Sequence, residues 1–420
     1  MWTKNNEIIC SILCVKKCRI LGGDKKSTRV HSVRFGQAFL GPAAFWPLIN
    51  TWRWNMLAAK KHAGGTTAGK FELIQILRFI AALAVVVCHS AFYSKERLDP
   101  GTISYNLGAN GVPLFFVISG FVMMIAAERM HSASGTWKLF AIRRIVRIVP
   151  LYWFATSVKL FTLLAAAGLV LHAQVDWLYI VKSYFFVPAI NVDNETKPLL
   201  AVGWTLLFEM FFYAVFTLAL LVRVDAVKFT APILVALAVA SVFKSDTWNV
   251  ALAFYSDPIV LNFLWGMLTA RLMERSVLIG RNAAVVILLF SLGYLFFPRF
   301  PEYGNTVTYG IASFFVVYCC ASLEKAVNFT LPRSLVFLGA ASYSIYLFHP
   351  LTAPVVPEVL KRLGVIYSVP SVVGSIFVAL CAGAFMYRFV ECPLTDRLNR
   401  YVKQYFSGST NFRKQMKSFE

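Results

Sequence analysis

The chain has 420 residues, of which 58% are hydrophobic and 15% are charged, and its mean hydropathy is +0.64. Soluble domains carry about 25% charged residues, so this composition excludes an ordinary soluble protein and indicates a polytopic membrane protein. The formal charge of +21 is concentrated at the two ends of the chain. Basic ends beside apolar spans are typical of cytoplasmic segments near anionic lipid and argue against a nucleic-acid-binding surface.

Residues 1–70 form a basic leader with twelve Lys and Arg against two acidic residues. The leader has neither the apolar core of a signal peptide next to a charged start nor a run long enough to cross a bilayer. We interpret it either as a disordered tail or as an over-extended gene start. The second interpretation rests on Met56, which opens a shorter basic leader that runs directly into the first apolar span.

The first apolar span, Phe71 to Ser90, carries two ionisable side chains in its interior, Arg78 and His89. Such groups are expensive inside a bilayer and usually have a function. The two residues are eleven positions apart, so on a helix they differ by only about 20° around the axis and by about 16 Å along it. One helix therefore presents a cation and an imidazole to the same neighbour or cavity. In the alternative interpretation, Arg78 snorkels to one interface while His89 bonds to another helix.

We predict an all-α fold of about ten transmembrane helices, because ten apolar runs approach the length that a bilayer requires. Several runs are shorter than the ideal of about 20 residues, so neighbouring helices must support them. A further run, Trp177–Ile190, is predicted to be interfacial or re-entrant. The ten predicted spans are Leu73–Phe92, Val112–Ala127, Leu151–Leu171, Trp204–Val222, Phe229–Phe243, Pro258–Leu272, Ala283–Phe297, Val307–Leu323, Phe337–Leu351 and Val369–Val390.

The charges of the loops predict the orientation of these spans. The loop 128–150 carries five Lys and Arg against Glu128 alone, and the loop after Leu272 is also basic. Both are expected to face the cytoplasm. The alternate loops are close to neutral or slightly acidic, except that the loop with Lys361 and Arg362 fits less well. With ten spans, both basic termini then lie in the cytoplasm.

Three arginines precede the third span in the stretch RRIVRIVPLYW. Arg144 and Arg147 are one helical turn apart, and Arg143 shares a face with Arg147. We interpret this group as an anion site on the inner face that suits a phosphate. The alternative is that the arginines only anchor the helix at the cytoplasmic interface.

The fourth span begins with GWTLLFEMFFY, which places Glu209 about one and a half turns inside it. A glutamate among Leu and Phe side chains needs a partner or stays protonated. Its predicted depth is close to that of His89, so we expect the two side chains to meet in one outward-facing pocket if the first and fourth spans are neighbours. A purely structural pairing of Glu209 with a hydroxyl on another helix is the alternative.

Two weaker candidates lie near the end of the chain. The stretch ASYSIYLFHPL places His349 at the outer end of the ninth span, and RFVECPL places Glu391 at the inner end of the tenth. A histidine before a proline is commonly a cap or interface residue, and Glu391 beside Arg388 is commonly a local ion pair. No cysteine and histidine set with metal-ligand spacing and no nucleotide-binding glycine loop is found in the sequence, so we expect no metal site.

Taken together, these stretches resemble the acyltransferase 3 family of integral-membrane O-acyltransferases. The resemblance rests on Arg78-x10-His89, GVPLFFVISGF at 111–121, the Arg144-x-x-Arg147 pair that leads into PLYW, GWTLLFEMFFY, SYSIYLFHP and RFVECP, in that order. It covers residues 71 to about 400, and the residues of these stretches are most similar to those of bacterial exopolysaccharide acetyltransferases. The 70-residue leader departs from the family pattern, and the additional C-terminal domain that some relatives carry is not present in this sequence.

The resemblance implies an enzyme that moves an acyl group, in these relatives acetyl, from acyl-coenzyme A to a hydroxyl of an exopolysaccharide or other cell-surface saccharide, free or lipid-linked. By motif match, His89 takes the place of the family's essential histidine, Arg78 that of its arginine partner, and Arg144 and Arg147 that of the inner-face pair. We expect His89 to act as general base or to carry the acyl group, Glu209 to orient the imidazole or the sugar, and the arginines to bind acetyl-coenzyme A as a substrate rather than as a resident cofactor.

The expected organisation is a leader at 1–70, an acyltransferase transmembrane domain at 71–396 and a basic cytoplasmic tail at 397–420, in the bacterial inner membrane. A transporter or flippase for a saccharide or lipid is the alternative function. Such a protein would also have ten helices and buried ionisable groups, although these groups would be expected at intervals along a transport path across the membrane.

Overall fold

The computed structural model describes residues 71–128, 136–297, 306–327 and 331–407. The predicted leader with Met56 and the end of the tail, 408–420, lie outside these ranges. The described residues form helices and loops, with a single isolated antiparallel bridge between Ile190 and Thr196. The all-α fold predicted from the sequence is therefore confirmed for this part of the chain.

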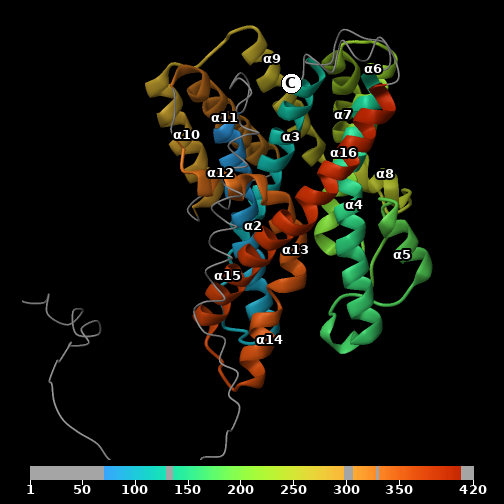
Figure 1. Ribbon diagram of the computed structural model, residues 1–420, viewed down its shortest axis with the longest axis vertical. Helices are drawn as coiled ribbons and strands as arrows, with labels where there is room; N and C mark the ends of the chain where they lie inside the picture. The colour runs from blue at the N-terminus through green and yellow to red at the C-terminus, as the bar shows by residue number, and fades with distance from the viewer. Residues whose placement is uncertain (1–70, 129–135, 298–305, 328–330, 408–420) are drawn as a thin grey trace, which may run out of the picture. The chain divides into compact units, whose positions relative to one another are not determined.

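Fifteen α-helices make up the described part of the chain (Figure 1). They are α2 Glu72–Arg97, α3 Gly111–Glu128, α4 Thr136–Ala165, α5 Trp177–Tyr184, α6 Trp204–Leu221, α7 Ala226–Ala240, α8 Val250–Tyr255, α9 Leu261–Glu274, α10 Arg281–Phe296, α11 Thr306–Ala326, α12 Arg333–Ala340, α13 Ser342–Thr352, α14 Val355–Arg362, α15 Ser368–Met386 and α16 Cys392–Ser407.

Each of the ten predicted spans coincides with helix. Within the described residues, seven helices are long and apolar enough to cross a membrane. Helix α12 and the helices that follow it are bent by 67° and form either a broken eighth span or a re-entrant loop. The remaining two predicted spans correspond to α9 and α10, which have 14 and 16 residues. The protein is a multi-pass membrane protein, and the count of ten spans stays a prediction.

Helix α4 begins earlier than predicted, at Thr136 instead of Leu151, and continues through Pro150. The arginine stretch is therefore a regular part of a 30-residue helix and not a loop before it. The predicted interfacial run contains the eight-residue helix α5. Asp176 caps this helix, because its carboxylate accepts hydrogen bonds from the backbone N–H groups of Leu178 and Tyr179.

Helices α3 and α9 cross very closely, and glycines permit the contact. A Cβ on Gly120 would lie 2.1 Å from the carbonyl oxygen of Phe263, and a Cβ on Gly266 would lie 2.0 Å from that of Val117. Small residues at crossings let membrane helices pack backbone against backbone. The ring of Phe263 also stacks on Phe212 of α6, with centroids 4.3 Å apart, so α3, α6 and α9 form one packed unit.

Helix α2 lies among α3, α11, α12, α13 and α15 (Figure 1). Its first turn is held by Glu324 of α11, whose carboxylate accepts hydrogen bonds from the backbone N–H groups of Glu72 and Leu73. On another side, Gly383 lets α15 approach α13, since a Cβ there would lie 2.5 Å from the Cα of Ile345. These contacts fix the two helices that carry His89 and His349.

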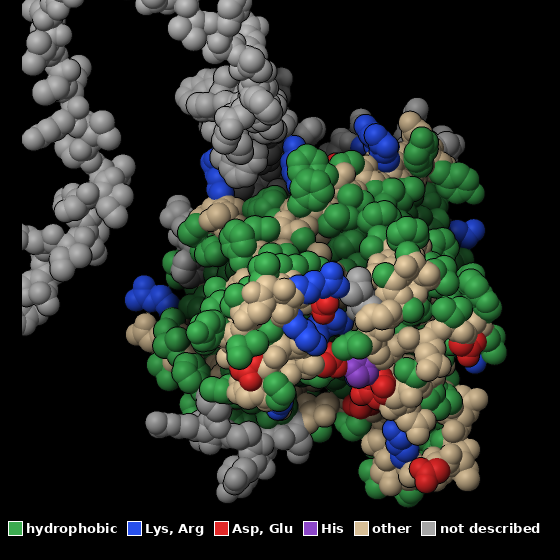
Figure 2. Space-filling view, turned by 90° about the horizontal axis from the view of Figure 1, so that it is seen from below, with side chains coloured by type: hydrophobic (Ala, Val, Ile, Leu, Met, Phe, Trp, Pro, Cys, Tyr) green, Lys and Arg blue, Asp and Glu red, His purple; other side chains and the backbone are tan. Residues whose placement is uncertain are grey.

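One face of the molecule carries a group of charged side chains surrounded by apolar and neutral ones (Figure 2). Ion pairs also join the end of α2 to other segments. Arg97 lies 4.0 Å from Glu358 of α14, and Glu96 contacts His172, which also lies 2.9 Å from Asp193. The segment between α4 and α6 is thereby tied to the C-terminal end of α2.

Candidate active site

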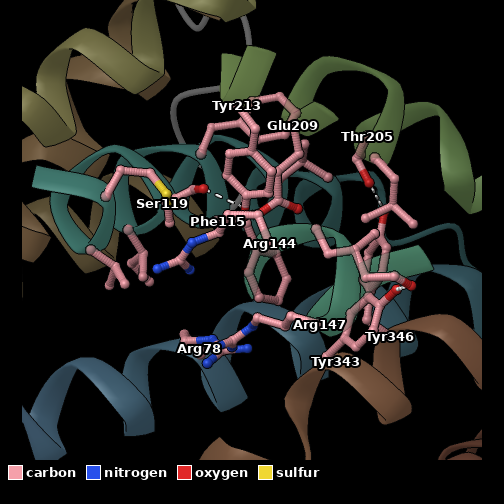
Figure 3. Close-up of a pocket in the computed structure, with 17 residues that line it drawn as sticks. Arg78, Phe115, Ser119, Arg144, Arg147, Thr205, Glu209, Tyr213, Tyr343 and Tyr346 are labelled. Atoms are coloured by element: carbon pink, nitrogen blue, oxygen red, sulfur yellow. Dashed lines mark hydrogen bonds between the residues drawn. The ribbon is translucent and has the colours of Figure 1, made fainter. Parts of the chain in front are cut away.

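A cavity lies among α2, α3, α4, α6 and α13 and is lined by seventeen residues (Figure 3). Its apolar walls come mainly from α3. Its polar lining residues are Arg78, Ser119, Arg144, Arg147, Thr205, Glu209, Tyr213, Tyr343 and Tyr346. The pocket is thus an apolar space with a few charged and hydroxyl groups at fixed positions, as in small-molecule sites generally.

Three cations line this cavity against one carboxylate. Arg78 comes from α2, and Arg144 and Arg147 come from successive turns of α4. Figure 3 shows the side chains of Arg78 and Arg147 next to each other. Within the described part of the chain, none of the three forms an ion pair with a carboxylate, so the cavity has an excess of positive charge. Arg143 does not line the cavity.

Arg144 is held in place by aromatic rings. Its guanidinium lies 5.4 Å from the ring centre of Phe140 and 5.9 Å from that of Tyr213, which are distances of cation–π contact. The Nε atom of Arg144 is buried and makes no hydrogen bond. A buried donor without a partner, beside two further arginines, is suited to an anionic group that enters the cavity.

Glu209 lies in the same cavity and is held by two hydroxyl groups. Its carboxylate accepts a hydrogen bond from Ser119 Oγ at 3.1 Å and one from the Tyr213 hydroxyl, one turn further along α6. Among the described residues, no hydrogen bond joins Glu209 to His89. The expectation that these two meet is wrong, because α6 packs against α3, α4 and α7 and not against the outer part of α2.

His89 instead contacts His349. Its Nδ1 lies 2.7 Å from Nε2 of His349, and the two rings meet edge to edge, with centroids 5.0 Å apart and planes inclined by 26°. His349 is completely buried, whereas His89 is partly exposed. His89, the stronger histidine candidate from the sequence, and His349, the weaker one, therefore form a pair, although they are 260 positions apart in the chain.

Tyr346 connects the histidine pair to the cavity. Its ring centre lies 5.8 Å from that of His349, one turn later on α13, and the residue lines the cavity. The Tyr346 hydroxyl lies 2.9 Å from Thr205 Oγ1 and 3.1 Å from the carbonyl oxygen of Val202. The arginines, the carboxylate and the hydroxyl pair line the cavity, whereas His89 and His349 do not and lie behind its wall at Tyr346.

Glu391 is not part of the cavity lining. It ends the π-helical turn between α15 and α16 and accepts a hydrogen bond from Ser344 Oγ at 2.5 Å. Among the described residues, no ion pair joins Glu391 to Arg388, which was the alternative interpretation of this carboxylate. Glu391 instead holds the start of α13 to the end of α15.

Sequence reasoning missed the hydroxyl groups of the site, Ser119, Thr205, Tyr213, Tyr343 and Tyr346. Neutral hydroxyls have no distinctive pattern of their own in a sequence. Ser119 and the two tyrosines of α13 do lie in the stretches GVPLFFVISGF and SYSIYLFHP, so their presence in those motifs was the available signal.

The arrangement offers an anion-binding group of arginines and a separate imidazole that can accept a proton. The described residues contain no group of three or more His, Cys, Asp or Glu that could hold a metal ion. The arginines and the imidazole suit a site in which side chains bind and activate the reactants.

Comparison with known proteins extends this description. The chain is 33% identical over 308 residues to the exopolysaccharide production protein ExoZ of Rhizobium meliloti (strain 1021), an alignment of 70% of this chain and 91% of that protein. It is 31% identical over 152 residues to the acyltransferase MdmB of Streptomyces mycarofaciens, covering 34% of this chain and 37% of that protein. Nodulation protein 10 of Rhizobium leguminosarum bv. viciae is 26% identical over 314 residues, covering 68% and 83%. No solved structure matches significantly.

The family described as "Acyltransferase domain" matches residues 72–388. This range contains every helix from α2 to α15 and every residue that lines the cavity. The chain therefore belongs to the acyltransferase 3 family and is a multi-pass membrane O-acyltransferase.

Proposed function

We propose that this enzyme transfers an acetyl group from acetyl-coenzyme A to a hydroxyl of an exopolysaccharide or other cell-surface saccharide. The observation that carries the proposal is the cavity lined by three arginines, with a histidine pair that contacts its wall at Tyr346. Similarity to an exopolysaccharide production protein over most of both chains supports the saccharide as acceptor.

The arginine end suits the donor. Acyl-coenzyme A is a long polyanion with its reactive thioester at one end, so a cluster of cations at one end of a site matches its charge and shape. Arg78, Arg144 and Arg147 are proposed to hold its phosphates. Glu209, fixed by Ser119 and Tyr213, lies opposite these cations and limits their mutual repulsion.

The histidine end suits the transfer. We assign His89 as general base, because it is the exposed member of the pair. As the acceptor hydroxyl oxygen bonds to the thioester carbon, its proton passes to the imidazole, and the carbon–sulfur bond breaks to release the thiolate of coenzyme A. The thiolate then takes the proton from the imidazolium. A covalent acyl-histidine intermediate would use the same residue.

The donor is proposed to arrive from the cytoplasm. Loop charge supports an inner-membrane protein with both termini in the cytoplasm, so the arginine end of the site would face inward and the histidine end outward. The acceptor would then approach from outside or within the outer leaflet. The transmembrane domain at 71–396 is proposed to hold all of these functions.

Coenzyme A release tests the proposal. Purified enzyme in lipid nanodiscs, supplied with acetyl-coenzyme A, should release free coenzyme A only after a polysaccharide acceptor is added, and mass spectrometry should show the acetyl group on that acceptor. Transport of saccharide across sealed vesicles without any coenzyme A release would contradict the proposal and favour a transporter.

A further inference from the structure

We propose that His349 is a positioning residue that fixes His89 in the tautomer able to act as base. This inference rests on the proposed function, since it assigns a role within the same reaction. It concerns which nitrogen of His89 is left without a proton.

A hydrogen bond between the two imidazoles requires a proton on the contacting nitrogen of one ring and a lone pair on the contacting nitrogen of the other. The atoms His89 Nδ1 and His349 Nε2 are 2.7 Å apart, which is a hydrogen-bond distance. For two neutral rings, either His89 donates from Nδ1 or His349 donates from Nε2. In the first case Nε2 of His89 carries a lone pair and can accept a proton. In the second case Nε2 of His89 already carries a hydrogen and cannot serve as base.

The local structure of α13 favours the first arrangement. In a regular helix, the carbonyl oxygen of Tyr346 would accept from the N–H of residue 350, but Pro350 has no N–H. The backbone carbonyls of Ile345 and Tyr346 favour a proton on the His349 imidazole. Its Nδ1 is buried and makes no hydrogen bond with another described group. A hydrogen on Nδ1 is attracted to these oxygens, whereas a lone pair there is repelled.

A hydrogen on Nδ1 leaves Nε2 of His349 as the acceptor. His89 must then donate from its Nδ1, and its Nε2 is the unprotonated nitrogen. Burial agrees with this division of roles, because His349 is completely buried and His89 is partly exposed. The dipeptide His349-Pro350 thus has a physical reason: the proline removes a competing donor and leaves the carbonyl of Tyr346 free to favour a hydrogen on the His349 ring.

The surroundings contain no carboxylate that could take this role. Among the described residues, neither histidine is hydrogen-bonded to Asp or Glu. The nearest aromatic neighbours are Tyr93, whose ring centre lies 6.0 Å from that of His89, and Tyr346, which lies 5.8 Å from that of His349. A neutral imidazole therefore orients the base, where a carboxylate does so in the Ser-His-Asp arrangement.

Two variants of similar size separate positioning from packing. His349→Gln keeps an amide oxygen near the place of Nε2, whereas His349→Met has a side chain of similar length without that acceptor. Each is measured in nanodiscs with acetyl-coenzyme A and polysaccharide, and kcat and the KM for the donor are obtained separately. The KM also reports whether the arginine cavity is intact.

We expect His349→Met to lower kcat by about a hundredfold, the scale on which an oriented general base contributes, with a donor KM within twofold of the parent enzyme. His349→Gln should stay within about tenfold of the parent kcat. Near-parental activity of both the Gln and the Met variants would show that His349 only fills space and would overturn the inference. A Gln variant as inactive as Met, with unchanged donor KM, would also overturn it, because His349 would then itself carry the proton.

The variant His89→Gln distinguishes this inference from the proposed function. If His89→Gln is inactive while His349→Met is normal, the reaction centre stands and only the role of His349 is wrong. If the parent enzyme does not release coenzyme A, the proposed function fails and the inference fails with it. If the parent enzyme releases coenzyme A and His89→Gln is fully active, the function stands, but the assignment of His89 as base and this inference are wrong.

Discussion

Arg78 and His89 show how two side chains of one helix can serve different parts of a site. Their spacing predicts a common face of the first span, and the structure gives them different partners. Arg78 lines the arginine cavity, and His89 pairs with His349. Residue spacing along α2 could predict the direction of each side chain, but the partner on α13 depends on how helices 260 positions apart pack together.

The arginines of α4 give the first test at the residue scale. Arg144→Ala and Arg147→Ala should each raise the KM for acetyl-coenzyme A by about tenfold or more, because a hydrogen bond to a charged group contributes about 1.5–3 kcal/mol. The value of kcat should change little, since phosphates far from the thioester are bound alike in the ground and transition states.

Arg143 is the matched control for this test, since it belongs to the same stretch but does not line the cavity. Arg143→Ala should leave the donor KM within about twofold of the parent, because its side chain does not line the cavity that holds the donor. Equal effects of all three substitutions would mean that the stretch acts only as a basic anchor.

At the scale of the elements, the segment between α4 and α6 depends on an exposed histidine. His172 bonds to Glu96 of α2 and to Asp193, and these two hydrogen bonds raise its pKa above the ordinary value. Because the pKa is raised in the folded protein, the stabilisation is complete below the unfolded value of about 6.5 and is lost as the pH rises through the folded value. The segment should therefore be held to α2 more firmly at mildly acidic pH.

Hydrogen exchange measures this effect. After correction for intrinsic rates, amides of the segment 172–200 should exchange faster at pH 8 than at pH 5.5, and the difference should vanish in His172→Gln. The helix α3 provides an internal reference, because its exchange should not depend on His172. A pH difference that persists in the Gln variant would assign the effect to other groups.

The elements themselves were partly predictable. All ten apolar runs are helical, since a bilayer leaves few other choices for the backbone. The bend between α12 and α13, the early start of α4 and the position of Glu209 among α3 and α4 were not predictable. Each of these depends on tertiary contacts, such as the close approach of α15 at Gly383, that have no signature in local hydropathy.

At the scale of the whole molecule, the number of membrane crossings depends on α9 and α10. With 14 and 16 residues they are about 21 and 24 Å long, which is short for a hydrocarbon core of about 30 Å. If both cross, residues 244–249 before α9 face outward and residues 275–280 between the helices face the cytoplasm. If α9 does not cross, both segments lie on one side.

Cysteine accessibility decides between these topologies. In a variant without the native cysteines, Asp246→Cys should react with a membrane-impermeant maleimide in intact cells, and Arg275→Cys should react only after the inner membrane is opened. Lys138→Cys, in the basic first part of α4, serves as the cytoplasmic reference. Labelling of positions 246 and 275 from the same side would refute the ten-span topology.

We propose that His89 acts as the base in the transfer and that the arginine cavity binds the donor. One variant tests both roles together. In His89→Ala, acetyl transfer to polysaccharide should fall by about a hundredfold or more, whereas equilibrium binding of radiolabelled acetyl-coenzyme A should stay within twofold of the parent enzyme, because the three arginines are unchanged. Near-normal transfer by the Ala variant, or loss of donor binding together with transfer, would contradict this account.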